Sequence, residues 1–341
     1  MAASATGSER SEKELFEATK EFAKENRVVS WLYVAQTIGV IAACIVATVV
    51  LKNPFARGAF SVVAGLTLVR LFILFHDYQH AAILKRSQVA KAVLGLCGGL
   101  LMTPPKVWRD THNYHHAHTA KIVGSHVGSY LMVTTDMWKS MTPKERFMYS
   151  AIRHPLTIVF AYFTVFMLEM LVSPLRRDPK KYWQNAIALL FNWSMTAFLL
   201  WKFGFAMFFF AFFLPLAVSM ALGAYLFYAQ HNFPEIHVQP RQAWNYTRAA
   251  LESSSYMKMG GVMNWFTGNI GYHHVHHLNP QVPFYRLPEA MASIPELQHP
   301  PTTSLMPKDV IACFRLKLWD NKAGHMVGYA QDETAPAPAA E

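Results

Sequence analysis

Five long apolar blocks constrain the fold of this chain more than any other feature of its sequence. The blocks cover residues 31–51, 58–75, 155–172, 183–201 and 203–228. Each is close to the roughly 20 residues that a helix needs to cross about 30 Å of hydrocarbon. The chain is also 52% hydrophobic and only 15% charged, which is unlike an ordinary soluble domain. We therefore predict an integral membrane protein.

Two apolar segments are not expected to cross. The segment 89–102 is too short and is followed by Thr103-Pro104-Pro105, so it is predicted to form a re-entrant or interfacial helix. The block 155–172 ends in SPLRRDPKKY, whose basic residues favour the cytoplasm by the positive-inside rule. We therefore predict that 155–172 lies in, or dips into, the cytoplasmic leaflet.

Four crossings remain. Their even number places both termini on the same side, which is the cytoplasm because the basic loop SPLRRDPKKY lies there. The sequence thus predicts an all-α membrane protein with four transmembrane helices, interfacial or re-entrant helices and a cytoplasmic, histidine-rich cap. The predicted crossings are 31–51, 55–75, 183–201 and 205–228. The predicted divisions are an amphipathic cytoplasmic segment at 1–29, the membrane domain at 30–305, and a cytoplasmic tail at 306–341 whose end is disordered.

The net charge of +10 fits the same topology, because basic residues gather at the cytoplasmic ends of membrane spans. These residues are scattered along the chain, and no recognised nucleic-acid fold accompanies them, so nucleic-acid binding is not expected. Arg70 lies inside the second predicted span, near its cytoplasmic end. We predict that its side chain extends to the interface as an anchor.

Histidines are concentrated in three short segments: HDYQH at 76–80, THNYHHAHT at 111–119 and GYHHVHHLNP at 271–280. His76 and His80 are four residues apart, so they share one face of a helix that continues from the second span. The other two segments each present histidines at i, i+3 and i+4, which again share a face: His112, His115 and His116, and His273, His276 and His277. All three segments can therefore meet at one place beyond the apolar core.

Imidazole binds iron, zinc, copper and nickel, and eight or nine imidazoles are too many for one ion of coordination number four to six. We therefore predict two metal ions, and iron is the natural choice for oxygen chemistry at a membrane. His231, in YAQHNFPE, leaves the last span on the same side and is a candidate ninth ligand. His118 and His274 lie off the shared helical faces, so we predict that neither is a ligand.

A metal-bound histidine usually donates its other ring N–H to a carboxylate, a carbonyl or water. Asp77 and Asp110 are close enough in sequence to serve as such partners. Other catalytic patterns are missing, because the sequence has no HExxH, no GxSxG and no phosphate-binding Gly-Lys-Ser/Thr loop. The Glu-x-x-His repeat of soluble di-iron bundles is absent as well.

The segments HDYQH, HNYHH and HHVHH give the chain a close resemblance to the membrane fatty acid desaturase superfamily, whose pattern is HxxxH, HxxHH and HxxHH. The resemblance covers roughly residues 60–300. Within the superfamily, the stretch from YAQHNFPE to FYRLPEA is similar to bacterial acyl-lipid omega-6 (delta-12-type) desaturases. The third box begins with histidine, unlike that of front-end desaturases. The first box has three residues between its histidines, where many acyl-CoA delta-9 enzymes have four.

The resemblance assigns metal ligands to nine positions: His76, His80, His112, His115, His116, His231, His273, His276 and His277. It also implies that two irons, O2 and two electrons remove two hydrogens from adjacent methylenes of an acyl lipid, which yields a cis double bond and water. No cytochrome b5 domain is fused to this sequence, so a separate ferredoxin or cytochrome b5 is the expected electron donor. A basic cytoplasmic face would attract an acidic donor.

The position of the double bond must depend on how far the acyl chain enters an apolar tunnel, because an unactivated methylene offers no polar handle. Candidate tunnel walls are the aromatic residues Trp108, Trp193, Trp265 and Phe266. Aromatic residues near an interface also act as membrane anchors, so this role is one of two that the pattern allows.

Two other functions stay open at this point. Acyl hydroxylases and carotenoid ketolases or hydroxylases share the three boxes, and analysis of the lipid product separates them from desaturases. A histidine-rich metal transporter is a remote, non-enzymatic alternative. Transporters place their ligands near the bilayer midplane, whereas these histidines follow the ends of spans.

Overall fold

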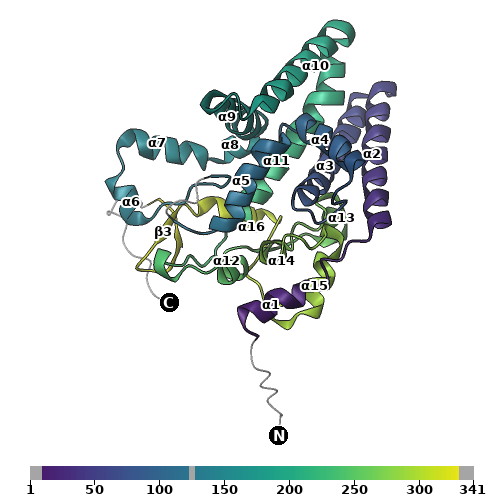
Figure 1. Ribbon diagram of the computed structural model, residues 1–341. Helices are drawn as coiled ribbons and strands as arrows, with labels where there is room; N and C mark the ends of the chain where they lie inside the picture. The colour runs from purple at the N-terminus through teal and green to yellow at the C-terminus, as the bar shows by residue number, and fades with distance from the viewer. Residues whose placement is uncertain (1–9, 123–126, 330–341) are drawn as a thin grey trace.

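The computed structural model describes residues 10–122 and 127–329 (Figure 1). Asparagine side chains cap the N-termini of its first two long helices. α2 (Arg27–Val50) begins after Asn26, whose side chain accepts a backbone hydrogen bond from the first turn. α3 (Pro54–Gln79) begins after Asn53, which caps it in the same way, and Pro54 has the fixed φ that suits a first helical position. The two helices therefore form a hairpin with a short turn.

A glycine, Gly204, divides the last of the three membrane-length helices. Among the described residues, three helices are long and apolar enough to cross a membrane: Arg27–Val50, Pro54–Gln79 and Trp183–Ala229. The last has 47 residues, and a straight helix of that length would extend about 70 Å, more than twice the hydrocarbon thickness. At Gly204 the backbone has φ 78° and ψ 176°, which is not helical and which glycine adopts readily. The chain doubles back there (Figure 1), between the predicted crossings 183–201 and 205–228.

Shorter helices surround the long ones. α4 (Gln88–Leu100) has 13 residues and ends before the two prolines, so it is too short to cross. The apolar block 155–172 does not form one regular helix, because a short α-helix is followed by a π-helix. The remaining long and peripheral elements are α6 (Thr135–Ser140), α7 (Pro143–Ile152), α8 (Pro155–Val159), η1 (Tyr162–Val172), α9 (Ser173–Arg177), α10 (Trp183–Phe208), η2 (Phe209–Phe213) and α11 (Leu214–Ala229).

The basic loop after α9 is tied to α5 (Pro105–His118), the helix that carries the second histidine segment. Lys181 Nζ lies 2.8 Å from the carboxylate of Asp110, and the hydroxyl of Tyr182 donates to the same carboxylate at 3.2 Å. Both ends of the segment between α5 and α10 therefore lie close together.

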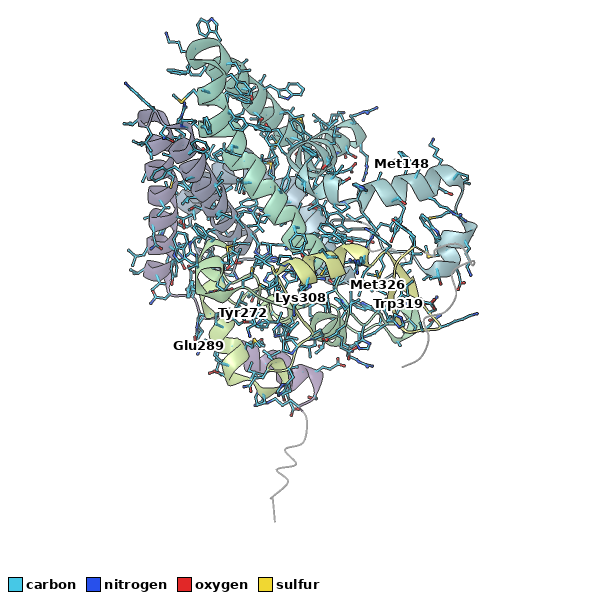
Figure 2. All side chains as sticks on the ribbon, turned by 180° about the vertical axis from the view of Figure 1, so that it is seen from behind. Met148, Tyr272, Glu289, Lys308, Trp319 and Met326 are labelled. Atoms are coloured by element: carbon cyan, nitrogen blue, oxygen red, sulfur yellow. The ribbon has the colours of Figure 1, made fainter. Side chains whose placement is uncertain are left out.

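The rest of the chain forms a cap below the long helices, visible from the back in Figure 2 around Tyr272, Lys308 and Trp319. Its strands are short: β1 (Tyr256–Lys258) pairs with β2 (Thr302–Ser304) in parallel, and β3 (Leu318–Asp320) pairs with β4 (His325–Val327) antiparallel. The fold is therefore mostly helical, and not all-α as predicted. The helices of the cap are α1 (Glu12–Thr19), η3 (Arg241–Ala243), α12 (Tyr246–Glu252), α13 (Gly260–Phe266), α14 (His273–Leu278), η4 (Phe284–Arg286), α15 (Leu287–Ser293), η5 (Pro295–Leu297) and α16 (Pro307–Arg315).

Both predicted terminal segments contribute to this cap. Thr19, on α1, accepts a hydrogen bond from the buried side chain of Asn279, next to the third histidine segment. Near the other end, the backbone of Trp319 donates to the carbonyl of Val133. Residues 307–327 are therefore folded against the cap, whereas the predicted disordered end lies outside the described residues.

The structure corrects the prediction for Arg70. Its side chain is only 3% exposed and does not extend to the interface. Instead the guanidinium donates to the carbonyl of Trp265 and lies over three aromatic rings, at 4.7 Å from Trp265, 5.1 Å from Tyr33 and 5.2 Å from Phe284. Cation–π contacts of this kind stabilise a desolvated cation. Arg70 therefore joins α3 to α2 and to the cap, and the prediction of an exposed anchor is wrong.

α3 and α11 approach each other closely at Gly65. A Cβ at this position would lie 2.7 Å from both the carbonyl oxygen of Pro215 and Cβ of Val218, which is too close for real atoms. Small residues allow such contacts between membrane helices. The contact fixes α3, which carries His76, against α11, which leads to His231.

We predict that Gly65→Ala destabilises the protein while Gly223→Ala, on α11, does not. A methyl group at Gly65 overpacks the contact, at a cost of about 1–3 kcal/mol, whereas a Cβ at Gly223 meets nothing within 4 Å. Both changes gain about 1 kcal/mol of helix propensity, so the difference between the two variants isolates the packing effect. Thermal unfolding of the purified protein in detergent measures it, and equal melting temperatures would contradict this packing.

Candidate metal centre

Four elements bring histidines to one place between the long helices and the cap. His76 lies in the last turn of α3 and His80 caps its C-terminus. α5 and α14 carry the second and third segments, and His231 follows the end of α11. Because each element ends or begins at the boundary of the apolar layer, the imidazoles meet just beyond it.

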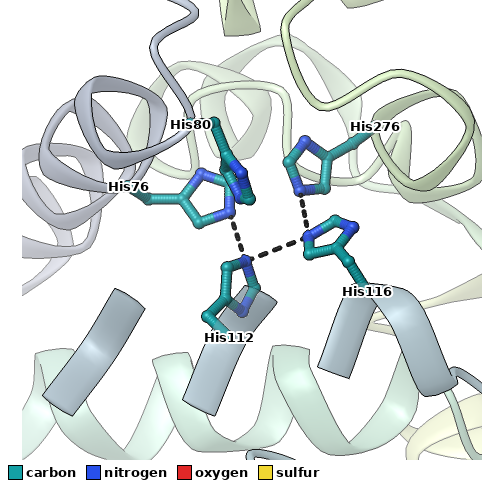
Figure 3. Close-up of side chains that lie close together, drawn as sticks. All are labelled: His76, His80, His112, His116 and His276. Carbon is teal, nitrogen blue, oxygen red and sulfur yellow. Dashed lines mark hydrogen bonds between the residues drawn. The ribbon is translucent and has the colours of Figure 1, made fainter. Parts of the chain in front are cut away.

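The histidines fall into two groups, within each of which all possible ligand atoms lie within 4.8 Å of one another. The first cluster, drawn in Figure 3, contains His76, His80, His112, His116 and His276. The second cluster contains His115, His231, His273 and His277. The nine positions that the resemblance assigns as ligands are therefore the nine that the structure brings together, and most of them are buried.

Helical geometry explains how one HxxHH segment serves two clusters. Residues four apart are separated by about 40° around a helix, whereas residues three apart differ by about 60° in the opposite direction. His112 and His116 accordingly point into the first cluster and His115 into the second. In the third segment, His273 and His277 share the second cluster and His276 reaches the first. The i, i+3, i+4 spacing thus distributes ligands between two adjacent centres.

The two clusters are in direct contact. The rings of His116 and His277, from different clusters, stack with their centroids 4.2 Å apart. Within α5, the ring centroids of His115 and His116 lie 5.7 Å apart, and within α14 those of His276 and His277 lie 5.7 Å apart. Two ions held by these clusters would therefore be close neighbours.

Distances between the Nε2 atoms fit metal binding better than hydrogen bonding. Nε2 of His112 lies 2.9 Å from Nε2 of His76 and 3.1 Å from Nε2 of His116. An imidazole nitrogen has a single in-plane position for a proton or lone pair, so it cannot make two good hydrogen bonds. Two ligand nitrogens that lie about 2.1 Å from one ion and at right angles to each other would be about 3.0 Å apart.

The second cluster shows the same pattern. Nε2 of His231 lies 3.1 Å from Nε2 of His115 and 2.9 Å from Nε2 of His273, and Nε2 of His277 lies 3.1 Å from that of His273. In the first cluster, Nε2 of His80 is buried with no hydrogen-bond partner among the described residues. A buried, unpartnered nitrogen is costly unless it binds an ion. The donor set therefore fits two metal ions.

The imidazoles of the second cluster are neutral at pH 7, which is the form that binds metals. Burial lowers the pKa of His231 to about 4. Burial, followed by the neighbouring imidazoles, holds the pKa of His115, His273 and His277 well below the usual range. The second cluster is therefore ready to bind a cation without first releasing protons.

Three of the candidate ligands have a hydrogen-bond partner at their other ring nitrogen. Nδ1 of His76 lies 3.0 Å from the carboxylate of Asp77, and Nδ1 of His231 lies 3.0 Å from the carbonyl of Ser253. Nδ1 of His277 lies 3.3 Å from the hydroxyl of Thr119. If each Nδ1 carries the proton, Nε2 is left free as a ligand atom. Thr119 and Ser253 were missed by the sequence analysis, although Thr119 follows His115 by one helical turn.

The two predicted carboxylate partners have different surroundings. Asp77 is buried, and its second oxygen accepts the backbone N–H of Phe284 at 2.7 Å, so it also links α3 to the cap. Among the described residues, the partners of the Asp110 carboxylate are Lys106, Lys181 and Tyr182, not a histidine. Asp77 therefore lies in position to orient a ligand, and Asp110 does not.

The two interleaved histidines lie outside both clusters. The ring of His118 stacks on Tyr114 with centroids 3.9 Å apart. His274 is fully buried, and its Nε2 lies 3.1 Å from the carbonyl of Leu297. Burial lowers the pKa of His274 to about 4, so the neutral ring donates this hydrogen bond. Its role in the structure is to fix α14 against η5.

The four aromatic residues considered as tunnel walls occupy three environments. Trp108 is buried and stacks on His112, with centroids 4.6 Å apart, so it lies beside the first cluster. Trp265 and Phe266, on α13, are half-buried, and Trp265 covers Arg70. Trp193 is 57% exposed on α10, as expected for a lipid-facing residue and not for the wall of an enclosed tunnel.

A small cavity of about 20 Å³ adjoins the second cluster. His115 and His231 line it, together with Tyr130, Met132 and Ile236. A cavity of this size holds about one water-sized molecule. It connects the second cluster to the segment that precedes α6.

Known proteins resemble this chain over most of its length. The fatty acid desaturase family model matches residues 52–304. A fatty acid desaturase of Bacillus subtilis (strain 168) is 29% identical over 272 residues, which is 80% of this chain and 77% of the relative. An sn-1 oleoyl-lipid 12-desaturase of a Synechocystis species is 24% identical and covers 81% of this chain and 79% of the relative. An sn-1 acyl-lipid omega-3 desaturase (ferredoxin) of Synechocystis is 25% identical, with coverage of 75% and 72%.

We expect alanine substitutions to separate ligands from neighbouring histidines. His276→Ala and His231→Ala remove a ligand nitrogen and should lower bound metal and abolish activity. His118→Ala and His274→Ala should retain nearly full metal, although His274→Ala loses a buried hydrogen bond and some stability. Metal analysis of the purified variants measures this. Wild-type metal content in His231→Ala, or loss of metal in His118→Ala, would contradict the assignment.

The two aspartates offer a matched pair. Asp77→Asn weakens the acceptor for His76 and should reduce metal affinity about 10- to 100-fold, the usual effect of removing such a partner. Asp110→Asn changes only contacts with lysine and tyrosine and should leave the affinity unchanged. Competition with a chelator measures both. Equal metal loss from the two variants would show that Asp77 has no special role.

Proposed function

The chain belongs to the fatty acid desaturase family, and we propose that it introduces a cis double bond into the acyl chain of a membrane lipid, using two irons held by the two histidine clusters. The observation that carries this proposal is the pair of adjacent, buried imidazole clusters at the ends of membrane-length helices. Family membership also makes the chain an oxidoreductase of a di-iron type.

Iron is the proposed metal because of the number of donors. Structural and catalytic zinc sites are almost always four-coordinate, whereas the first cluster offers five imidazoles and the shortest nitrogen separations suit right angles. When bound, a di-iron centre would supply the O2 chemistry that removes two hydrogens from adjacent methylenes; two electrons from a donor and two protons complete the reduction of O2 to two molecules of water.

The tasks of the protein are positioning and exclusion of water. His76 is fixed by Asp77, and His231 by the carbonyl of Ser253, so these ligands are held before a metal binds. The clusters are buried under the cap, which keeps bulk water from the reacting carbon. The cavity beside His115 holds about one water-sized molecule and is too small for an acyl chain.

Omega-6 (delta-12-like) regiochemistry is the finer part of the proposal. It is supported by the similarity of the YAQHNFPE to FYRLPEA stretch to that group and by the 12-desaturase relative from Synechocystis. The omega-3 desaturase relative covers a similar share of the chain, so only the product can decide between these positions.

We also propose four crossings, with the histidine clusters and both ends of the chain in the cytoplasm. Two observations support this arrangement. The break at Gly204 divides the third apolar segment in two, and Lys181 is bound to Asp110 on the histidine-bearing helix. The segment 155–172 then enters and leaves the membrane on one side. A ferredoxin or cytochrome b5 in the cytoplasm would deliver electrons, consistent with the net charge of +10 and the ferredoxin named for one relative.

Expression in a host that lacks polyunsaturated lipids tests the function. We expect a new cis double bond, located by mass spectrometry at the omega-6 position, and we expect it to disappear with His276→Ala or when iron is withheld. A hydroxylated or ketone product, or full activity with zinc alone, would refute the proposal. A double bond at another position would refute only the regiochemistry.

Cysteine labelling tests the topology. A cysteine at Ser173, next to the basic loop, should be protected from a membrane-impermeant reagent in intact cells and should react after permeabilisation. Phe55→Cys, exposed in the first turn of α3, serves as the outward-facing control and should react in intact cells. Reaction of Ser173→Cys from outside would require 155–172 to cross.

A further inference from the structure

α7 (Pro143–Ile152) shows an unusual distribution of side chains, because its apolar residues face outward. Phe147 is 70% exposed, Met148 51% and Ile152 40%. At about 100° per residue these three positions span an arc of about 140°, which is one face of the helix. Exposed apolar patches of this kind mark a surface that binds something.

The opposite face of α7 fixes this orientation. Tyr149 is 2% exposed and its hydroxyl donates to the carbonyl of Lys317. Arg153, which caps the helix, is 1% exposed and donates to the carbonyl of Leu131 and the side chain of Asn232. The helix therefore cannot rotate to hide its apolar face without breaking buried hydrogen bonds.

The apolar face of α7 continues into the next elements. Leu156 and Val159 on α8, followed by Phe160, are each more than half exposed, and Leu168 on η1 is 51% exposed. These elements lead through α9 to α10, whose surface carries exposed leucine, phenylalanine and tryptophan residues. The exposed face of α7 is thus one end of the lipid-facing surface of the long helices.

The direction of α7 also suits a membrane surface. Figure 1 shows α7 running across the direction of α2 and α10, at about the height of α8. In Figure 2, Met148 lies on the edge of α7 that faces the side toward which the long helices extend. A helix with this placement lies parallel to the bilayer plane and turns its apolar face toward the acyl chains.

We propose that α7 is an interfacial helix whose Phe147, Met148 and Ile152 side chains insert into the acyl region of the leaflet on the side of the histidine clusters. The partner of this apolar face is the lipid bilayer, which the neighbouring apolar surface of α8, η1 and α10 also contacts. Lys144, on the same arc in the first turn, is exposed and can extend its ammonium to lipid phosphates.

This placement connects the membrane surface to the cavity beside the second cluster. Arg153 binds the carbonyl of Leu131, and the flanking residues Tyr130 and Met132 are walls of that cavity. A membrane-bound α7 therefore holds the cavity wall next to the leaflet from which a lipid substrate would come. The proposal depends on the membrane location of the chain and not on the reaction that it catalyses.

Spin labelling of the metal-loaded, full-length protein in nanodiscs of phosphatidylcholine and phosphatidylglycerol tests the proposal. Nitroxides are attached to Met148→Cys and Leu156→Cys in a Cys97→Ser background, since the thiols of Cys44 and Cys313 are buried. Collision with O2, which concentrates in lipid, is compared with collision with a water-soluble nickel chelate. Val46→Cys, exposed on α2, provides the lipid reference, and Ser140→Cys, exposed on α6, provides the water reference.

We expect the ratio of oxygen to nickel accessibility at residues 148 and 156 to match that at residue 46 and to exceed that at residue 140 several-fold. A ratio at residue 148 like that at residue 140 would show that α7 faces water and would overturn the proposal. Protection of residue 148 from both reagents would also overturn it, because a second copy of the chain or another protein would then cover the face.

Discussion

The convergence of nine imidazole nitrogens on two neighbouring points is the interaction on which the rest of this structure depends. Buried side by side, these nitrogens cannot all be satisfied by hydrogen bonds, since each has one in-plane position and several face two or more others. Cations at the two points would satisfy them together. The groups around the clusters then share one role. Asp77, Thr119 and the carbonyl of Ser253 each contact Nδ1 of a candidate ligand, so that its Nε2 points toward the cluster.

The fold holds these imidazoles at fixed positions relative to one another, although they come from distant parts of the chain. The close contact at Gly65 holds α3 against α11, so that two membrane helices present their histidines at a fixed separation. Arg70 and Asp77, about two helical turns apart on α3, both contact Phe284, which follows the third histidine segment. The cap is thus attached to α3 at two points, one of which, Asp77, also contacts His76 of the first cluster.

Much of the site could be predicted from sequence because its signals are local. Spacing of i, i+3 and i+4 places His112, His115 and His116 on one helical face whatever the rest of the chain does, and the three boxes identify the family. What sequence could not supply depends on tertiary contacts. The division of each HxxHH segment between two clusters, the burial of Arg70 among aromatic rings, and the separation of Asp77 from Asp110 follow from packing between remote segments. The folding of residues 307–327 against the cap is likewise a product of long-range contacts. The break at Gly204, in contrast, lies between the two crossings that the sequence predicts, 183–201 and 205–228.

The central claim is that imidazoles alone, from two clusters, hold two irons. Iron K-edge X-ray absorption of the purified protein, combined with an iron count per chain, tests it most directly. The account predicts two irons per chain, one for each cluster, and a first shell dominated by nitrogen, with the outer-shell scattering that imidazole rings produce. One iron per chain, or a first shell dominated by carboxylate oxygen, would contradict the account.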